Sequence, residues 1–124
     1  MQPIPRLFFA TAVIFVLIGM GWGIHMSATT DFTLAPAHGH LNLIGFVAMA
    51  VFGTYYALVP KAASGRLAIA HYTLAVLTVV VMVPGIAMAI NQSGEALAKA
   101  GSGLAVLTML LFLFVIVRFR DPAA

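Results

Sequence analysis

The sequence LFFATAVIFVLIGMGWGIHM, residues Leu7–Met26, decides the fold because none of its residues is charged at neutral pH, with histidine taken as neutral. The uncharged stretch around it extends from Arg6 to Asp31. A helix needs about 20 mostly apolar residues to cross the hydrocarbon core of a bilayer. This stretch therefore predicts a membrane-spanning helix near residues 7–26.

Three further stretches of the chain are also free of charge. They lie between Asp31 and Lys61, between Arg66 and Glu95, and between Lys99 and Arg118. Each is close to or above the length that a membrane span needs. The expected helices lie near residues 35–59, 66–90 and 95–119. The fold class is therefore an all-α membrane protein with four transmembrane helices in a single domain, 1–124, whose consecutive helices are antiparallel because the connections are short.

The composition excludes several classes of protein. Of the 124 residues, 63% are hydrophobic and 7% are charged, whereas a soluble domain carries about 25% charged residues. A soluble enzyme and a disordered chain are thereby excluded. The net charge of +3 is too small for a nucleic-acid partner, which needs many phosphate contacts. The absence of cysteine excludes disulfides, thiolate metal sites and c-type haem attachment.

The basic residues predict the orientation of the chain. Lys and Arg concentrate in the cytoplasmic segments of membrane proteins. If both termini are cytoplasmic, only Lys99 falls on the outer side. The inner side then carries the other five basic residues, which are Arg6, Lys61, Arg66, Arg118 and Arg120. We therefore expect a multi-pass protein of a bacterial inner membrane with cytoplasmic N- and C-termini.

Small residues on the first and last helices predict close packing between helices. Such residues let backbones approach each other where apolar side chains gain nothing over lipid. The first helix carries the pair Gly19 and Gly23. The last carries a stripe that consists of Gly94, Ala98, Gly101 and Ala105.

Four histidines carry most of the available chemistry, because ionisable groups inside a membrane are costly and mark functional sites. His25, His38 and His40 lie near the outer ends of their helices, whereas His71 lies near the inner end of the third helix. About 20 Å of depth separates His71 from His38. One metal ion cannot bind both. For His71 we expect a structural role, with its ring bonded to a backbone carbonyl or to a neighbouring helix.

The pair His38 and His40 is the most informative feature. Two residues apart on an α-helix, they point about 200° away from each other, so they can serve two different sites, one on each side of the helix. Asn42 and Gly45 share the face of His38, and Gly45 has no side chain that would block a flat macrocycle. The face of His40 carries the apolar residues Leu43, Val47 and Leu58. Histidine binds haem iron, copper and zinc, so the pair could bind metal. In the alternative interpretation, the two histidines bind no metal, and one faces a neighbouring helix while the other faces water at the membrane surface.

Two segments of this helix resemble a known family. Ala37–Phe46 (AHGHLNLIGF) and Phe52–Pro60 (FGTYYALVP) are similar to the second helix of catalytic subunit I in the haem–copper oxidase and nitric oxide reductase superfamily, and to short subunit I-like membrane proteins. In that family, a histidine at the outer end of this helix is an axial ligand of the low-spin haem. Another helix of the family carries a His-x-His pair that binds two haems.

The resemblance implies that His38 and His40 are metal ligands, each an axial ligand of haem b. Asn42 and Gly45 would lie beside the cofactor, and His25 would contact a haem propionate or water. Copper is the second candidate cofactor. The chain lacks the family's consecutive histidine pair for copper, and it lacks the histidine and tyrosine four residues apart that complete the oxygen-reducing site. The resemblance therefore implies haem binding without oxygen reduction.

The family's subunit has twelve helices in three four-helix arcs, and three copies of this chain would supply the same number. We therefore expect a homotrimer in which His38 of one protomer and His40 of the next bind one haem, giving one haem per protomer. The expected function is electron transfer or redox sensing, with a quinol or a periplasmic cytochrome as electron partner. Two alternatives remain open. One is a non-haem metal protein that uses His25, His38, His40 and Asp31, and the other is an accessory subunit of a larger oxidase or nitric oxide reductase.

Overall fold

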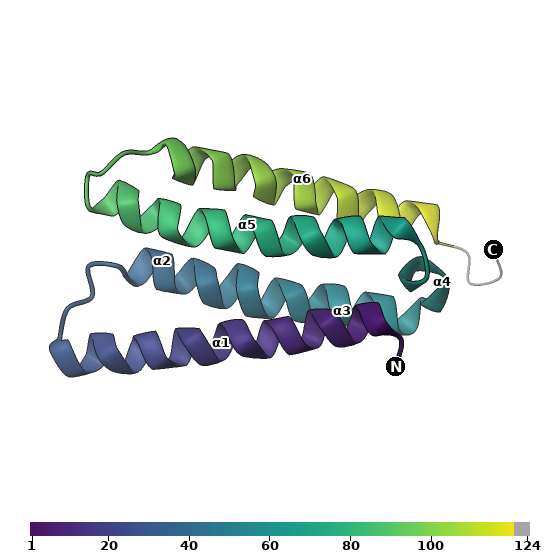
Figure 1. The fold of residues 1–124 in the computed structure, drawn as a ribbon, viewed down its shortest axis with the longest axis horizontal. Coiled ribbons are helices and arrows are strands. Elements are labelled where there is room, and N and C mark those ends of the chain that lie inside the picture. Colours follow the sequence, from purple (N-terminus) through teal and green to yellow (C-terminus); the bar gives the residue numbers. More distant parts are fainter. Residues whose placement is uncertain (121–124) are drawn as a thin grey trace.

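The computed structural model describes residues 1–120, which form four long helices without any strand in that range (Figure 1). Each is long and apolar enough to cross a membrane, so the predicted number of spans is confirmed. The first, third and fourth spans are single helices. The second is continuous but changes its winding twice. The elements in chain order are α1 (Pro3–Thr29), α2 (Ala35–His40), the π-helix η1 (Leu41–Ala48), α3 (Met49–Leu58), α4 (Pro60–Ala63), α5 (Arg66–Ile90) and α6 (Ala96–Arg118).

The predicted bounds of the first helix, 7–26, are too short at both ends. The helix begins at Pro3, because proline is well tolerated in the first helical turn, where no N–H is needed. It ends at Thr29, beyond which Thr30 adopts a left-handed backbone conformation with φ of 50°. Charged residues indicate where a span leaves the bilayer. The ends of the helix itself are set by local features, here the proline at its start and the left-handed residue after its end.

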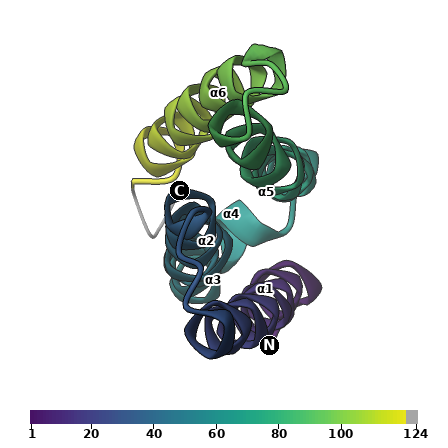
Figure 2. The same ribbon diagram turned by 90° about the vertical axis from the view of Figure 1, so that its left-hand side faces the viewer.

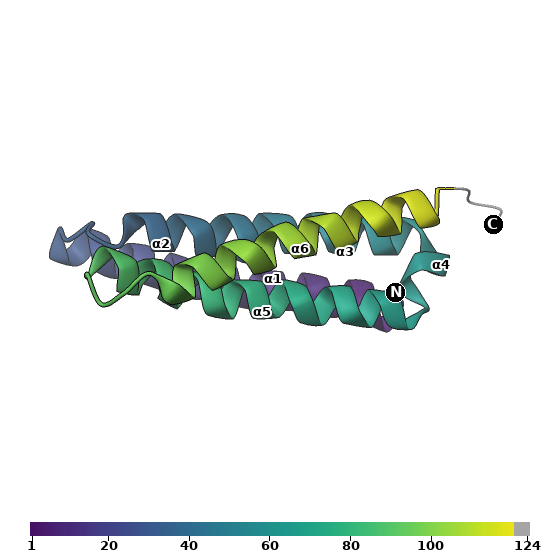
Figure 3. The same ribbon diagram turned by 90° about the horizontal axis from the view of Figure 1, so that it is seen from above.

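The four spans are arranged as two antiparallel hairpins. α1 packs against η1 and α3, and α5 packs against α6. Contacts of α5 with α2 and η1 join the hairpins. Viewed along the spans, α1 and α6 lie on opposite sides of the molecule (Figure 2), and all four spans run along its long axis (Figure 3). The chain start, α4 and the end of α6 share one end of the molecule, so the segments rich in basic residues lie together.

The second span differs from the uniform α-helix that the sequence predicted. Burial recurs at every fourth residue, at Ala37, Leu41, Gly45 and Met49. Positions four apart on an α-helix drift by about 40° at each step, which would carry Met49 far from the face of Ala37. The wider winding of η1, with its bonds between residues five apart, keeps these positions facing the rest of the protein.

Side-chain hydrogen bonds connect α5 to each of the other three spans. Such bonds hold helices together in lipid, where apolar side chains gain little by packing together. Each joins a residue of α5 to a side chain that is distant in sequence. The three pairs are Thr11 with Tyr72 at 2.6 Å, Tyr56 with His71 at 2.9 Å, and Thr78 with Thr108 at 2.9 Å.

Glycines bring the backbones of α5 and α6 into close contact. A Cβ atom at Gly101 of α6 would lie 2.6 Å from the Cα atom of Met82. At Gly85 of α5, a Cβ would lie 2.6 Å from the backbone nitrogen of Ala98. Gly101 belongs to the stripe of small residues that the sequence assigns to helix packing, and the structure confirms that assignment for Gly101.

Candidate functional site

His38 lies in α2, at the end of the molecule opposite the chain start, and faces α1. Its Nε2 is 2.8 Å from the backbone carbonyl of Gly19 and 3.4 Å from Nδ2 of Asn42. The shorter contact indicates that Nε2 carries the proton and donates it to the carbonyl oxygen. The indole of Trp22 stands edge-on to the imidazole, with ring centroids 5.8 Å apart. His38 is half-buried, and its ring contacts residues of the same chain.

His40 is oriented differently. Its Nδ1 is 2.7 Å from the backbone carbonyl of Pro36, one turn earlier in the same helix. Nδ1–H therefore donates to the carbonyl oxygen, and Nε2 keeps its lone pair. A metal-binding histidine usually donates its second ring N–H to a carbonyl or carboxylate, which fixes the ring and its tautomer. The geometry of His40 thus fits a metal ligand as it stands.

The apolar face below His40 is exposed. Leu43, Val47 and Val51 are 59%, 46% and 54% exposed. A groove of about 530 Å³ continues along the same side of the span toward α6. Its lining is almost entirely apolar and consists of Phe46, Val47, Ala50, Val51, Thr54, Tyr55, Leu58 and Phe112. A flat apolar group could lie against this face without displacing any part of the fold.

Asn42 and Gly45, expected beside a cofactor, instead face α1. Gly45 is buried, and a Cβ at this position would lie 3.0 Å from the Cβ of Phe15. The missing side chain therefore makes room for Phe15 and not for a macrocycle. The amide of Asn42 lies against Gly19, and its Oδ1 is buried without a hydrogen-bond partner. Gly19, one of the predicted small-residue pair, therefore leaves the space that the amide of Asn42 occupies.

His25 is exposed near the C-terminal end of α1. It lines a small cavity of about 130 Å³ together with Asp31 and four other residues. Hydrogen bonds from the side chain and backbone of Thr33 hold the pKa of Asp31 below its ordinary value, so this loop carboxylate stays ionised. Over residues 1–120, no three His, Asp or Glu side chains come together as a metal site. The alternative of a non-haem metal held by His25, His38, His40 and Asp31 is therefore not supported by the structure.

His71 occupies the centre of the core and is fully buried. Its ring stacks on Phe112 at 5.5 Å and lies 4.6 Å from Phe52. Nδ1 is bonded to the hydroxyl of Tyr56, 2.9 Å away on α3. The expected bond to a neighbouring helix is confirmed. The sequence analysis does not predict this position in the core, although aromatic residues recur near the same end of several spans and indicate it.

The bond between Tyr56 and His71 leads to a stability prediction. Tyr56→Phe should lower the free energy of unfolding by about 1–2 kcal/mol, because the change leaves Nδ1 of His71 buried without a partner. Unfolding of the detergent-solubilised protein measures the effect. The matched control is Tyr55→Phe, which removes the hydroxyl of a half-buried neighbour. Equal stability of the two variants would contradict a contribution from the hydrogen bond.

No family model matches the chain, and no curated protein and no solved structure matches it either. The resemblance to the haem–copper oxidase superfamily therefore depends on the two quoted segments of the second span alone.

Proposed function

We propose that this chain is a b-type haem-binding integral membrane protein with a role in electron transfer or redox sensing. The observation that carries the proposal is the geometry of His40, whose Nδ1–H is fixed by the carbonyl of Pro36 at 2.7 Å. Its Nε2 lone pair remains available at the outer end of an exposed apolar face. Haem b held by two histidines would supply a one-electron redox centre without an open position for oxygen.

The second axial ligand in this proposal is His38 of a neighbouring protomer, within a homotrimer that holds one haem per protomer. His38 would have to exchange its contact with Gly19 for the metal, whereas His40 would keep its bond to Pro36. The two histidines therefore contribute unequally. His40 positions the cofactor in the free protomer, and His38 completes the site on assembly. A quinol or a periplasmic cytochrome is the proposed electron partner.

Absorption spectroscopy of the purified protein tests the haem assignment. A Soret band with sharp low-spin bands in the reduced state, and one haem per protomer, are expected. The mass of the detergent-solubilised particle tests the trimer separately. A colourless protein that stays colourless after incubation with haem would refute the proposal, and a haem-bearing monomer would refute only the shared ligands.

The orientation is part of the proposal and follows from the shared basic end of the molecule. Reporter fusions after Ala124 and in the loop between α1 and α2 should place the C-terminus in the cytoplasm and the loop outside, because basic segments are retained inside. A fusion reporter active in the periplasm at Ala124 would reverse the topology. It would also place His38 and His40 at the cytoplasmic surface.

A further inference from the structure

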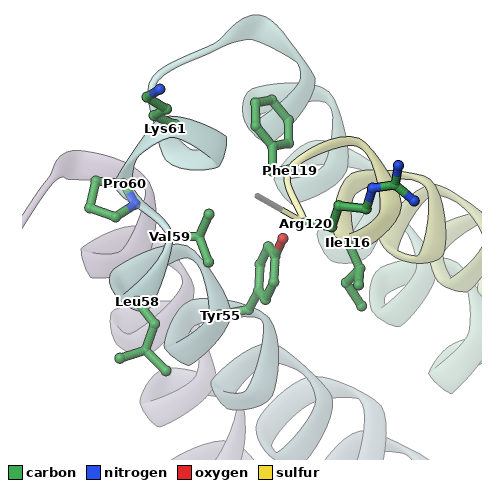
Figure 4. A pocket seen from close by; sticks show the side chains of 8 residues that line it. All are labelled: Tyr55, Leu58, Val59, Pro60, Lys61, Ile116, Phe119 and Arg120. Carbon is green, nitrogen blue, oxygen red and sulfur yellow. The ribbon is translucent and has the colours of Figure 1, made fainter. Parts of the chain in front are cut away.

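Two buried side-chain atoms among residues 1–120 lack a hydrogen-bond partner, Nε2 of His71 and Oδ1 of Asn42. The first lies in the closed aromatic core, whereas the second belongs to an amide beside His38 of the candidate site. A cavity of about 360 Å³ at the other end of the second span is lined by two basic residues, but the charged ends of Lys61 and Arg120 point away from it (Figure 4). Asn42 is therefore the polar side chain near the candidate site that still lacks a role.

The amide of Asn42 and the imidazole of His38 lie against the small-residue pair of α1. A Cβ at Gly23 would lie 3.2 Å from Nε2 of His38, and a Cβ at Gly19 would overlap Oδ1 of Asn42. In each helix the two residues are four positions apart, so each glycine lies beside one polar side chain. His38 and Asn42 thus approach the same short stretch of the α1 backbone.

Both side chains lie beside one hydrogen-bond acceptor, the carbonyl oxygen of Gly19. Nε2–H of His38 donates to it at 2.8 Å. Nδ2 of Asn42 lies 3.4 Å from the same Nε2, which has no lone pair to accept a hydrogen bond while it carries the proton. With His38 in this position, the amide of Asn42 therefore lies against Gly19 with its own hydrogen-bonding capacity unused.

We propose that Asn42 is a positioning residue that replaces His38 as the donor to the Gly19 carbonyl when His38 binds haem iron. This inference rests on the proposed function, in which His38 exchanges its contact with Gly19 for the metal. To bind through Nε2, the ring of His38 turns away from α1 and its proton moves from Nε2 to Nδ1, so the ring stays neutral. A half-turn of the amide then places Nδ2 against Gly19, and Oδ1 faces the space that the imidazole leaves.

This exchange lowers the free-energy cost of releasing His38. In both states one side chain of the second span donates to α1, and such interhelical bonds hold helices together in lipid. α1 can therefore stay packed against the second span while His38 moves. Without the amide, the departure of His38 would leave the carbonyl of Gly19 with no side-chain donor.

A double-mutant cycle on the haem-free protein tests the exchange without depending on haem. His38→Ala is made in the unmodified chain and in Asn42→Leu, which keeps a similar volume without the amide. We expect His38→Ala to lower the folding equilibrium constant about tenfold more in the Asn42→Leu background, because no replacement donor is left for the carbonyl. An equal loss in both backgrounds, or a smaller loss with leucine, would overturn the proposal. If leucine prevents folding, Asn42→Ala completes the same cycle.

The haem-loaded protein supplies a spectroscopic readout. At an unchanged haem-to-protomer ratio, Asn42→Leu should lose part of the low-spin spectrum and bind more carbon monoxide in the reduced state, because releasing His38 then costs more while His40 still holds the haem. The matched control is Thr73→Val, which removes an exposed hydroxyl bonded only within its own helix and should keep the low-spin spectrum.

The outcomes separate this inference from the function on which it rests. Unchanged low-spin bands in Asn42→Leu would refute the role of Asn42 and leave haem ligation intact, and equal losses in Asn42→Leu and Thr73→Val would refute it as well. An unmodified protein that takes up no haem would refute the proposed function. The double-mutant cycle would still decide whether Asn42 replaces His38 at Gly19.

Discussion

Replacing His40 with Ala is expected to abolish the low-spin haem spectrum and to lower the haem-to-protomer ratio at least about tenfold. The reason is local, because His40 is the histidine whose free nitrogen is already oriented, with Nδ1 bonded to the Pro36 carbonyl. The substitution removes the one histidine ligand that can bind iron without first giving up a contact in the fold. Absorption spectra and haem extraction from the purified variant measure the effect.

The other histidines provide the comparisons. His25→Ala should keep the spectrum, since His25 is exposed at the end of α1. His38→Ala should lose the low-spin bands if the neighbouring protomer supplies the second ligand. An unchanged spectrum in His40→Ala would remove the basis of the haem proposal. An unchanged spectrum in His38→Ala alone would leave His40 as a ligand and refute the shared site.

Gly101→Val is expected to lower the free energy of unfolding by about 2–3 kcal/mol, because the added side chain would force apart two helices that touch through their backbones. The Cβ of such a side chain would lie 2.6 Å from the Cα of Met82 and 2.7 Å from its Cβ. A backbone atom cannot move aside as the tip of a side chain can. Unfolding of the detergent-solubilised variant measures the loss.

The same helix supplies a matched control. Gly103 lies two residues further along α6, and a Cβ at this position would meet nothing within 4 Å. Gly103→Val therefore makes the same change of residue type in the same helix, and its stability should remain close to that of the unmodified protein. If Gly103→Val were as destabilised as Gly101→Val, helix propensity and not the contact with Met82 would explain the loss.

The number of spans could be predicted because charges are so rare in this chain. The third predicted range, 66–90, coincides with α5, and the fourth, 95–119, differs from α6 by one residue at each end. Each of these helices has a charged residue at or beside at least one end, at Arg66, Glu95 or Arg118. The first helix, in contrast, continues past Arg6 to Pro3, where local helix-capping preferences and not charge decide the end.

The details of the candidate site could not be predicted in the same way. A helical wheel assumes that the helix is wound uniformly. No residue type in 41–48 predicts a π-helix, so the wheel cannot give the correct faces of this segment. The opposed directions of His38 and His40 follow from their spacing within α2, whereas the packing of Gly45 against Phe15 depends on how closely α1 approaches. The burial of His71 likewise depends on side chains from three other spans.

The π-helix η1 makes the length of the second span as important as its composition. Residues in an α-helix follow one another at about 100°, so deleting a single residue from 41–48 would turn α2 by roughly that angle relative to α3. His38 would then leave Gly19, and His40 would turn away from its exposed face. Every side chain could be preserved and the site would still be lost. We therefore expect this segment to tolerate the exchange of one apolar residue for another far better than the insertion or deletion of a single residue.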